Sequence, residues 1–218
     1  MRRALETISR EVDSSAGPLL ELGIGTGRMA LPLAEAGFQV AGIDISDKML
    51  AHLRAKALQA DRPIHMIRGD VLHLPFRERI FAAILAVHVF HLIDDLHACL
   101  LEARRVLKPG GCVLFGGEPR LLRHVQQVLR EEYDYGIQDD LVEMLAELGV
   151  RLLDQDELER KVTASLQALG AQVERFPAIE WDYEITCGDI VGRIEGRIAS
   201  YLWNVPEEGL KRLVERLR

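Results

Sequence analysis

Short apolar runs alternate with segments of helical spacing along the first half of the chain. Runs typical of buried strands lie at 19–22, 39–43, 64–68, 81–87 and 112–115. Apolar positions three and four residues apart predict helices around them, at 5–13, 29–37, 47–60 and 94–106. The second of these helices requires Pro32 in its first turn. Strands alternating with helices favour an α/β fold, a Rossmann-like, doubly wound and mostly parallel sheet with ligands at the carboxyl ends of its strands.

The pattern changes after Gly117. Further helices are predicted at 121–133, 140–148, 157–169, 189–202 and 207–217, and a partly alternating strand at 172–186. This organisation predicts a Rossmann-like core over residues 1–117 and a helical cap, inserted after the fifth strand, over residues 118–170. Residues 171–218 are expected to complete the domain with a sixth strand and C-terminal helices.

Three glycines follow the first strand, in the pattern Glu21-x-Gly23-x-Gly25-x-Gly27. Glycines in a strand-to-helix turn let the backbone bend sharply and approach a ligand, and the unpaired N–H groups of the following helix attract an anion. A pyrophosphate-binding loop would carry its third glycine at position 28, which is Arg28 here. The spacing therefore favours a different nucleoside ligand, one whose anionic group is a carboxylate.

Two aspartates end the next two strands. Asp44 lies about 20 residues after the glycine loop, where an acidic side chain can bind both ribose hydroxyls. Asp70 ends the third strand, where its carboxylate can accept a hydrogen bond from an adenine amino group. Either aspartate alone is more simply explained as a helix cap or turn residue. Together with the glycine loop, each at its own strand end, they indicate a nucleoside site.

Four segments resemble, in this order, the motifs of the class I S-adenosylmethionine-dependent methyltransferases. They are the glycine loop at 20–27, the acidic strand end at 42–46, the Gly-Asp-Val-Leu-His-Leu-Pro-Phe segment at 69–76 and the Arg-Arg-Val-Leu-Lys-Pro-Gly-Gly turn at 104–111. The resemblance runs from about residue 18 to 116. Within the class it is closest to small-molecule methyltransferases of the ubiquinone/menaquinone-biosynthesis type. It implies S-adenosylmethionine as cofactor and methyl transfer to a small-molecule acceptor.

The resemblance also assigns each motif to a part of the cofactor. Glu21 and the glycine loop would hold the methionine end, Asp44 the ribose and Asp70 the adenine. Apolar side chains beside the two aspartates would line the adenine pocket, and the end of the fourth strand would lie beside the sulfonium and its methyl group. The expected cofactor-binding residues are Glu21, Gly23, Ile24, Gly25, Gly27, Arg28, Asp44, Ile45, Met49, Asp70, Val71, Leu72, Val87 and His88.

Two features depart from the family's pattern. The family's sheet normally ends in an antiparallel seventh strand, whereas this chain closes on predicted helices. We therefore expect a truncated chain or a missing terminal segment. The stretch before the first strand is short. Its length argues against the lid that usually covers the cofactor in this family.

No catalytic residue is assigned by the sequence. The cluster His88-Val-Phe-His91 leaves three interpretations open: a general base, a contact in the substrate pocket, and a structural histidine bonded to a neighbouring loop. No third ligand accompanies the histidine pair, so no metal is expected. Because a sulfonium is already an activated methyl donor, alignment of donor and acceptor supplies much of the rate.

Composition narrows the expected partners. The 218 residues carry a formal net charge of -7, which argues against binding a nucleic-acid backbone. The longest apolar stretch, at 80–93, is too short to span a membrane, and the N-terminus lacks the apolar core of a signal peptide. We therefore expect a cytoplasmic monomer or homodimer that acts on a small-molecule acceptor, with no nucleic-acid or membrane partner.

Two alternative functions stay open. The motifs indicate cofactor binding but not activity. The protein could therefore be methyltransferase-like, bind the cofactor without activity, and serve as a sensor or partner subunit. A nicotinamide-dependent oxidoreductase is less favoured, because Arg28 stands where its phosphate-binding loop needs a glycine.

Overall fold

A computed structural model describes residues 2–58, 63–116, 147–148, 155–176, 187–196 and 205–217. The chain divides into two compact units, which are taken separately below. The first joins Met1–Gly117 to Leu158–Ile179, and the second joins Glu118–Glu157 to Glu180–Arg218. The division into core, cap and C-terminal part stays a prediction. Within the described ranges, no helix has the length and apolar character that crossing a membrane requires.

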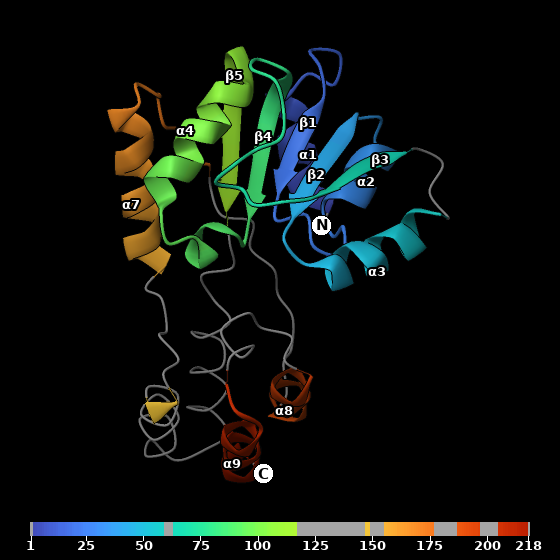
Figure 1. The fold of residues 1–218 in the computed structure, drawn as a ribbon, viewed down its shortest axis with the longest axis vertical. Coiled ribbons are helices and arrows are strands. Elements are labelled where there is room, and N and C mark those ends of the chain that lie inside the picture. Colours follow the sequence, from blue (N-terminus) through green and yellow to red (C-terminus); the bar gives the residue numbers. More distant parts are fainter. Residues whose placement is uncertain are drawn as a thin grey trace. The chain divides into compact units, whose positions relative to one another are not determined.

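The first unit is built on a five-stranded sheet (Figure 1). Its strands are β1 (Leu19–Leu22), β2 (Val40–Asp44), β3 (Ile64–Arg68), β4 (Phe81–Val87) and β5 (Leu107–Gly116). Their order is β3-β2-β1-β4-β5, and neighbouring strands run parallel. The chain winds from β1 outward to β3 and then starts again at β4 on the other side. A topological switch point therefore lies between β1 and β4, and the predicted Rossmann-like sheet is confirmed.

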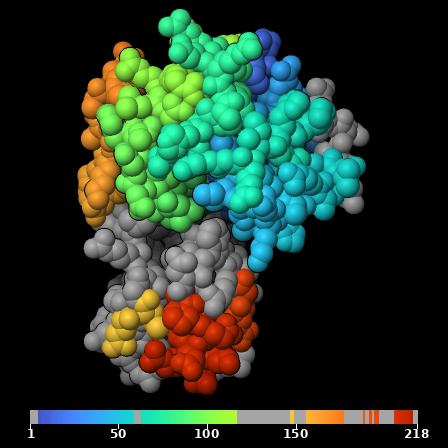
Figure 2. Space-filling model, viewed as in Figure 1, coloured from blue at the N-terminus to red at the C-terminus, as the bar shows by residue number. Residues whose placement is uncertain are grey.

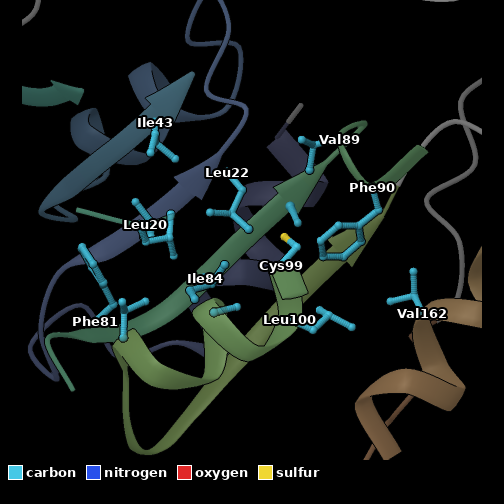
Figure 3. Close-up of a cluster of buried hydrophobic side chains, with 14 of the residues drawn as sticks. Leu20, Leu22, Ile43, Phe81, Ile84, Val89, Phe90, Cys99, Leu100 and Val162 are labelled. Carbon is cyan, nitrogen blue, oxygen red and sulfur yellow. The ribbon is translucent and has the colours of Figure 1, made fainter. Parts of the chain in front are cut away.

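One face of the sheet packs on α4 (Leu96–Val106) and α7 (Gln155–Ala168). Leu20, Leu22 and Ile84 point toward this face, where they meet Leu100 of α4 and Val162 of α7 (Figure 3). All five side chains are at most 1% exposed. The helix predicted at 157–169 thus forms, and its buried residues belong to the core of the first unit.

The opposite face packs on α1 (Arg2–Glu11), α2 (Ala30–Glu35) and α3 (Asp47–Ala57). Leu19 of β1 and Leu85 of β4 point to this side, because successive side chains in a strand alternate between faces. Buried residues on both faces explain why β1, β2 and β4 read as continuous apolar runs in the sequence.

Side-chain caps mark where α3 and α4 begin. Ser46 precedes α3 and accepts a hydrogen bond from the Met49 N–H at 3.3 Å, and Asp95 caps α4 by accepting one from the Ala98 N–H at 2.9 Å. Helix α2 begins at Ala30, so Pro32 lies in its first turn as required. The helix ends at Glu35, and Gly37 follows two residues later with a φ of +99°, which suits the left-handed turn that closes the helix.

Two strand predictions need correction. Strand β5 begins at Leu107 rather than 112, with an irregularity in its pairing: Phe81 pairs with Leu107, but Ala83 pairs with Cys112. The extra residues form a bulge around Gly110, which has a φ of +77°. The strand predicted from 172 is absent over 171–176, where Arg175 instead forms an ion pair with Glu159 of α7 at 2.6 Å. Residues 177–186 lie outside the described ranges.

The second unit is described mainly by α8 (Cys187–Glu195) and α9 (Glu207–Leu217). The two helices contact each other, and Val191 of α8 and Leu213 of α9 are buried. The prediction at 207–217 is confirmed, and the helix predicted at 189–202 is present as far as Glu195. The helix predicted at 121–133 and most of that at 140–148 lie outside the described residues.

Candidate functional site

The glycine loop follows β1 in a conformation that only glycine adopts without strain. Gly23, Gly25 and Gly27 have φ values of +64°, +54° and +79°. A Cβ on Gly23 would lie 2.7 Å from the Val89 side chain, and one on Gly27 would overlap Leu53. A Cβ on Gly25 would meet only the Gly23 carbonyl oxygen, at 3.8 Å. The outer glycines therefore permit close packing, whereas the middle one leaves open space beside the backbone.

Asp44 links the glycine loop to the end of β2. Its Oδ2 accepts a hydrogen bond from the Gly25 N–H at 2.8 Å, and its Oδ1 accepts one from the Ser46 N–H at 2.8 Å. These bonds fix the carboxylate at the carboxyl edge of the sheet, and each oxygen keeps capacity for a further hydrogen bond. The next residue, Ile45, has a large apolar side chain that is 70% exposed to solvent.

Asp70 lies just beyond β3, at the same edge. The Gly69 N–H donates to the Asp44 carbonyl oxygen at 3.0 Å, which ties the ends of β3 and β2 together. The Asp70 carboxylate accepts a hydrogen bond from the Leu72 N–H at 2.9 Å. Asp70 is exposed, whereas Val71 and Leu72 pack against the core. The aspartate thus does serve as a turn residue, with its carboxylate still accessible at the strand end.

Glu21 is buried beneath the loop, with only 4% of its surface exposed. Within the described part of the chain, its Oε2 has no hydrogen-bond partner. Burial raises the pKa of this carboxyl from 4.5 to about 8. The hydrogen bond from the Ala30 N–H and the charge of Arg28 lower the pKa, while the charge of Asp44 raises it. A buried oxygen without a hydrogen-bond partner destabilises the folded protein. The site therefore fits a ligand that supplies a hydrogen-bond donor, and a positively charged donor fits best.

His88 directly follows β4 and has a φ of +55°, in the left-handed region that non-glycine residues rarely adopt. Its N–H donates to the Gly116 carbonyl oxygen at 3.0 Å, at the end of β5. The following residue, Val89, is the one that packs on Gly23. The strained turn therefore places His88 next to the glycine loop, and such strain is often found at functional sites. His91 lies in the short 3-10 helix η1 (Phe90–Leu92), where burial lowers the pKa of its imidazole.

The carboxyl ends of β1, β2, β3 and β4 thus bring the predicted site residues to one edge of the sheet. Met49 lies half-buried in the first turn of α3, and Arg28 is exposed where α2 begins. Their contacts with a cofactor stay predictions. The sequence patterns assign no role to Ser46, Glu102 or Arg105. Glu102 and Arg105 hold the segment after β3 through hydrogen bonds to Leu74 and Phe76. The only signal for Arg105 was its place in the Arg-Val-Leu-Lys-Pro-Gly-Gly motif.

Comparisons with known proteins agree with this architecture. Residues 20–115 match the family model of a methyltransferase domain. A demethylmenaquinone methyltransferase of Tropheryma whipplei is 40% identical over 95 residues, covering 43% of this chain and 38% of that protein. A ubiquinone/menaquinone biosynthesis C-methyltransferase of Desulfotalea psychrophila is 32% identical over 133 residues, covering 60% and 53%.

Among solved structures, a protein of Methanococcus maripaludis has a similar fold. Its TM-score is 0.52 at 22% identity, with 71% of this chain and 68% of that one covered. The strand order β3-β2-β1-β4-β5 defines a Rossmann-like fold for the first unit. Over residues 20–115, a little under half of the chain, the sequence is therefore similar to methyltransferases that carry this domain. The chain spans about two fifths to one half of the length of the two curated relatives above.

Proposed function

We propose that this protein transfers a methyl group from S-adenosylmethionine to a small-molecule acceptor. The observation that carries the proposal is the pairing of Asp44 with Gly25 directly beside Glu21, whose buried Oε2 lacks a partner. The Asp44 carboxylate is held at the site by backbone N–H groups. The buried Glu21 carboxyl requires a hydrogen-bond donor from a ligand, and a cationic donor fits best. A nucleoside joined to an amino acid satisfies both.

Each carboxylate of the site has an assigned part of the cofactor. Glu21 would receive the ammonium group, with the loop N–H groups and Arg28 near the carboxylate of the same amino acid. Asp44 would accept hydrogen bonds from the ribose hydroxyls, and Asp70 one from the adenine amino group. The exposed side chain of Ile45 would be covered by the adenine ring, which removes apolar surface from water.

Catalysis would rest on alignment more than on acid–base chemistry. When bound, the cofactor supplies a methyl group activated by its sulfonium. The residues of this chain hold the nucleoside, exclude water and present the end of β4 to the acceptor. We assign Val87 and His88 to this position. Because alignment accounts for much of the rate, we favour His88 as a wall of the pocket over a general base.

The acceptor is proposed to be small and largely apolar. The two curated relatives are named for methylation in menaquinone and ubiquinone biosynthesis, so a quinone precursor is the first acceptor class to test. The net charge of -7 supports such an acceptor over a nucleic acid. The residues that select the acceptor are expected in the region predicted as a cap, 118–170, which lies beyond the matched domain.

The test is methyl transfer from isotope-labelled S-adenosylmethionine to a panel of demethylated quinones and other phenolic acceptors, followed by mass spectrometry. We expect labelled product with the wild type. We expect roughly 100-fold weaker binding of S-adenosylhomocysteine by Asp44→Ala, which removes two charge-assisted hydrogen bonds. Asp47→Ala is the matched control, because Asp47 is exposed and forms a surface ion pair with Arg68 at 2.7 Å.

Three results would change the assignment. A wild-type protein that does not bind S-adenosylhomocysteine would exclude the proposed function. Tight binding without transfer to any acceptor would favour the inactive sensor or partner subunit. Unchanged affinity in Asp44→Ala would remove Asp44 from the ribose site.

A further inference from the structure

Arg105 of α4 forms a dense set of hydrogen bonds outside the motifs that would touch the cofactor. Its Nε and one terminal nitrogen donate to the two carboxylate oxygens of Glu102, at 2.6 and 2.7 Å. The same fork donates to the carbonyl oxygens of Phe76 and Leu74, each at 2.8 Å. Glu102 in turn accepts a hydrogen bond from the Leu74 N–H at 2.8 Å. The pair therefore holds both backbone groups of Leu74.

The segment held in this way, residues 70–76, begins with the proposed adenine site. Asp70 accepts hydrogen bonds from two following residues, through its carboxylate from the Leu72 N–H at 2.9 Å and through its carbonyl from the His73 N–H at 3.0 Å. Leu74, the next residue, is only 4% exposed. Asp70 thus holds the turn up to His73 by hydrogen bonds, and the next residue, Leu74, is held by the Glu102–Arg105 pair.

The position of α4 agrees with this coupling. Burial, together with the negative charges of Asp70 and Glu102, raises the pKa of the Cys99 thiol to about 12. Cys99 therefore lies close enough to both carboxylates to respond to them. In Figure 2 the segment after β3 (teal) lies on the surface beside α4 (green).

Arg105 and Glu102 have the chemical groups needed to hold a segment that lacks regular secondary structure. Residues 69–80 contain neither helix nor strand, so their carbonyl groups depend on side chains or water. The planar guanidinium of arginine offers several donors in fixed directions, which a lysine cannot reproduce. The side chains of Arg105 and Glu102 are 32% and 23% exposed, so solvent only partly screens their interaction.

We propose that Arg105 and Glu102 are positioning residues that set the selectivity of the cofactor site for adenine. By fixing residues 70–76 they hold the Asp70 carboxylate where it accepts a hydrogen bond from the adenine amino group, and hold Val71 against the ring. This inference rests on the proposed function, in particular on the adenine role of Asp70.

The experiment compares two ligands by calorimetric titration. S-adenosylhomocysteine carries the amino group, and S-inosylhomocysteine replaces it with an oxygen. We expect the wild type to prefer the adenine ligand, and Arg105→Ala to reduce that preference roughly tenfold, as for the loss of one hydrogen bond to a charged group. Asp70→Ala should remove the preference as well, and adding Arg105→Ala to it should reduce it no further.

Matched variants separate positioning from a general loss of stability. Arg104→Ala changes an exposed arginine of the same helix and should keep the wild-type preference. Arg105→Lys loses the guanidinium fork, and Glu102→Gln loses one of the two acceptor oxygens, whereas both retain much of the packing. Both should therefore lower the preference even if Arg105→Ala fails to fold.

Each outcome decides a separate point. If the wild type binds neither ligand, the proposed function fails. If it binds both equally, the adenine role of Asp70 fails. If Asp70→Ala loses the preference while Arg105→Lys and Glu102→Gln keep it, or lower both affinities by the same factor, the positioning role is overturned and the proposed function stands.

Discussion

At the residue scale, Glu21 shows how strongly burial can change an ionisable group. It alternates with Leu20 and Leu22 along β1 and so faces the side of the sheet covered by α2, where Ala30 donates to its carboxyl. With a pKa of about 8, the carboxyl is largely neutral at pH 7. The ammonium group of a bound amino acid would favour the ionised form, so cofactor binding should be linked to release of a proton.

This pKa predicts a pH dependence of stability. Between pH 4.5 and about 8 the unfolded chain has lost a proton that folded Glu21 still holds, so the free energy of unfolding falls as pH rises through this range. Glu21→Gln removes this dependence. We therefore compare the free energy of unfolding in urea between Glu21→Gln and the wild type. The difference should shift in favour of the variant by about 1 kcal/mol or more when the pH is raised from 5 to 8.

Glu35→Gln provides the control, because Glu35 is exposed at the end of α2. It should leave the difference between pH 5 and pH 8 as in wild type. Equal pH dependence in the wild type and Glu21→Gln would mean that Glu21 ionises normally in the folded protein.

At the scale of elements, the close approach of β2 to the glycine loop depends on Gly42. A Cβ at this position would overlap the Ile24 side chain and lie 2.6 Å from its Cβ. Ile24 is 2% exposed and its N–H donates to the Ile43 carbonyl oxygen at 3.1 Å, so it has little room to move. The distance between loop and strand is therefore set by the absence of a single side chain.

Gly42→Ala should accordingly destabilise the fold by about 1–3 kcal/mol, the usual cost of overpacking a core, and weaken S-adenosylhomocysteine binding by displacing the loop. Denaturant unfolding and calorimetric titration measure the two effects. Gly192→Ala in α8 is the comparison, because nothing lies within 4 Å of its added Cβ and alanine favours helix; it should be neutral or stabilising. Normal stability in Gly42→Ala would show that Ile24 can repack.

At the scale of the whole molecule, the proposed ligand site lies within the first unit, at one edge of its sheet. A ligand that binds only the folded state raises the melting temperature, by an amount equivalent to about 2.7 kcal/mol at 100 times its Kd. Scanning calorimetry should therefore show an upward shift with S-adenosylhomocysteine and none with NAD. The shift should shrink in Asp44→Ala. A shift with NAD alone would overturn the interpretation of Arg28 and the glycine spacing.

The sequence by itself determined the alternation of strands and helices, the sheet class and the positions of the acidic strand ends, because these follow from local patterns of burial and turn residues. β1, β3 and β4 lie where the apolar runs predict, and β2 begins one residue later than predicted. Local patterns failed at 107–111, where pairing with β4 decides that the turn becomes a bulge, and at 172–176, where side-chain contacts replace a strand.

Only the tertiary structure decided which groups at the site meet. The sequence placed Asp44 and Gly25 19 residues apart, and their hydrogen bond forms because β1 and β2 are parallel neighbours. The partnerless Oε2 of Glu21, the left-handed turn at His88 and the hold of Arg105 on Leu74 likewise depend on packing between elements. Periodicity cannot predict such contacts, since it records which face a residue occupies and not what lies against that face.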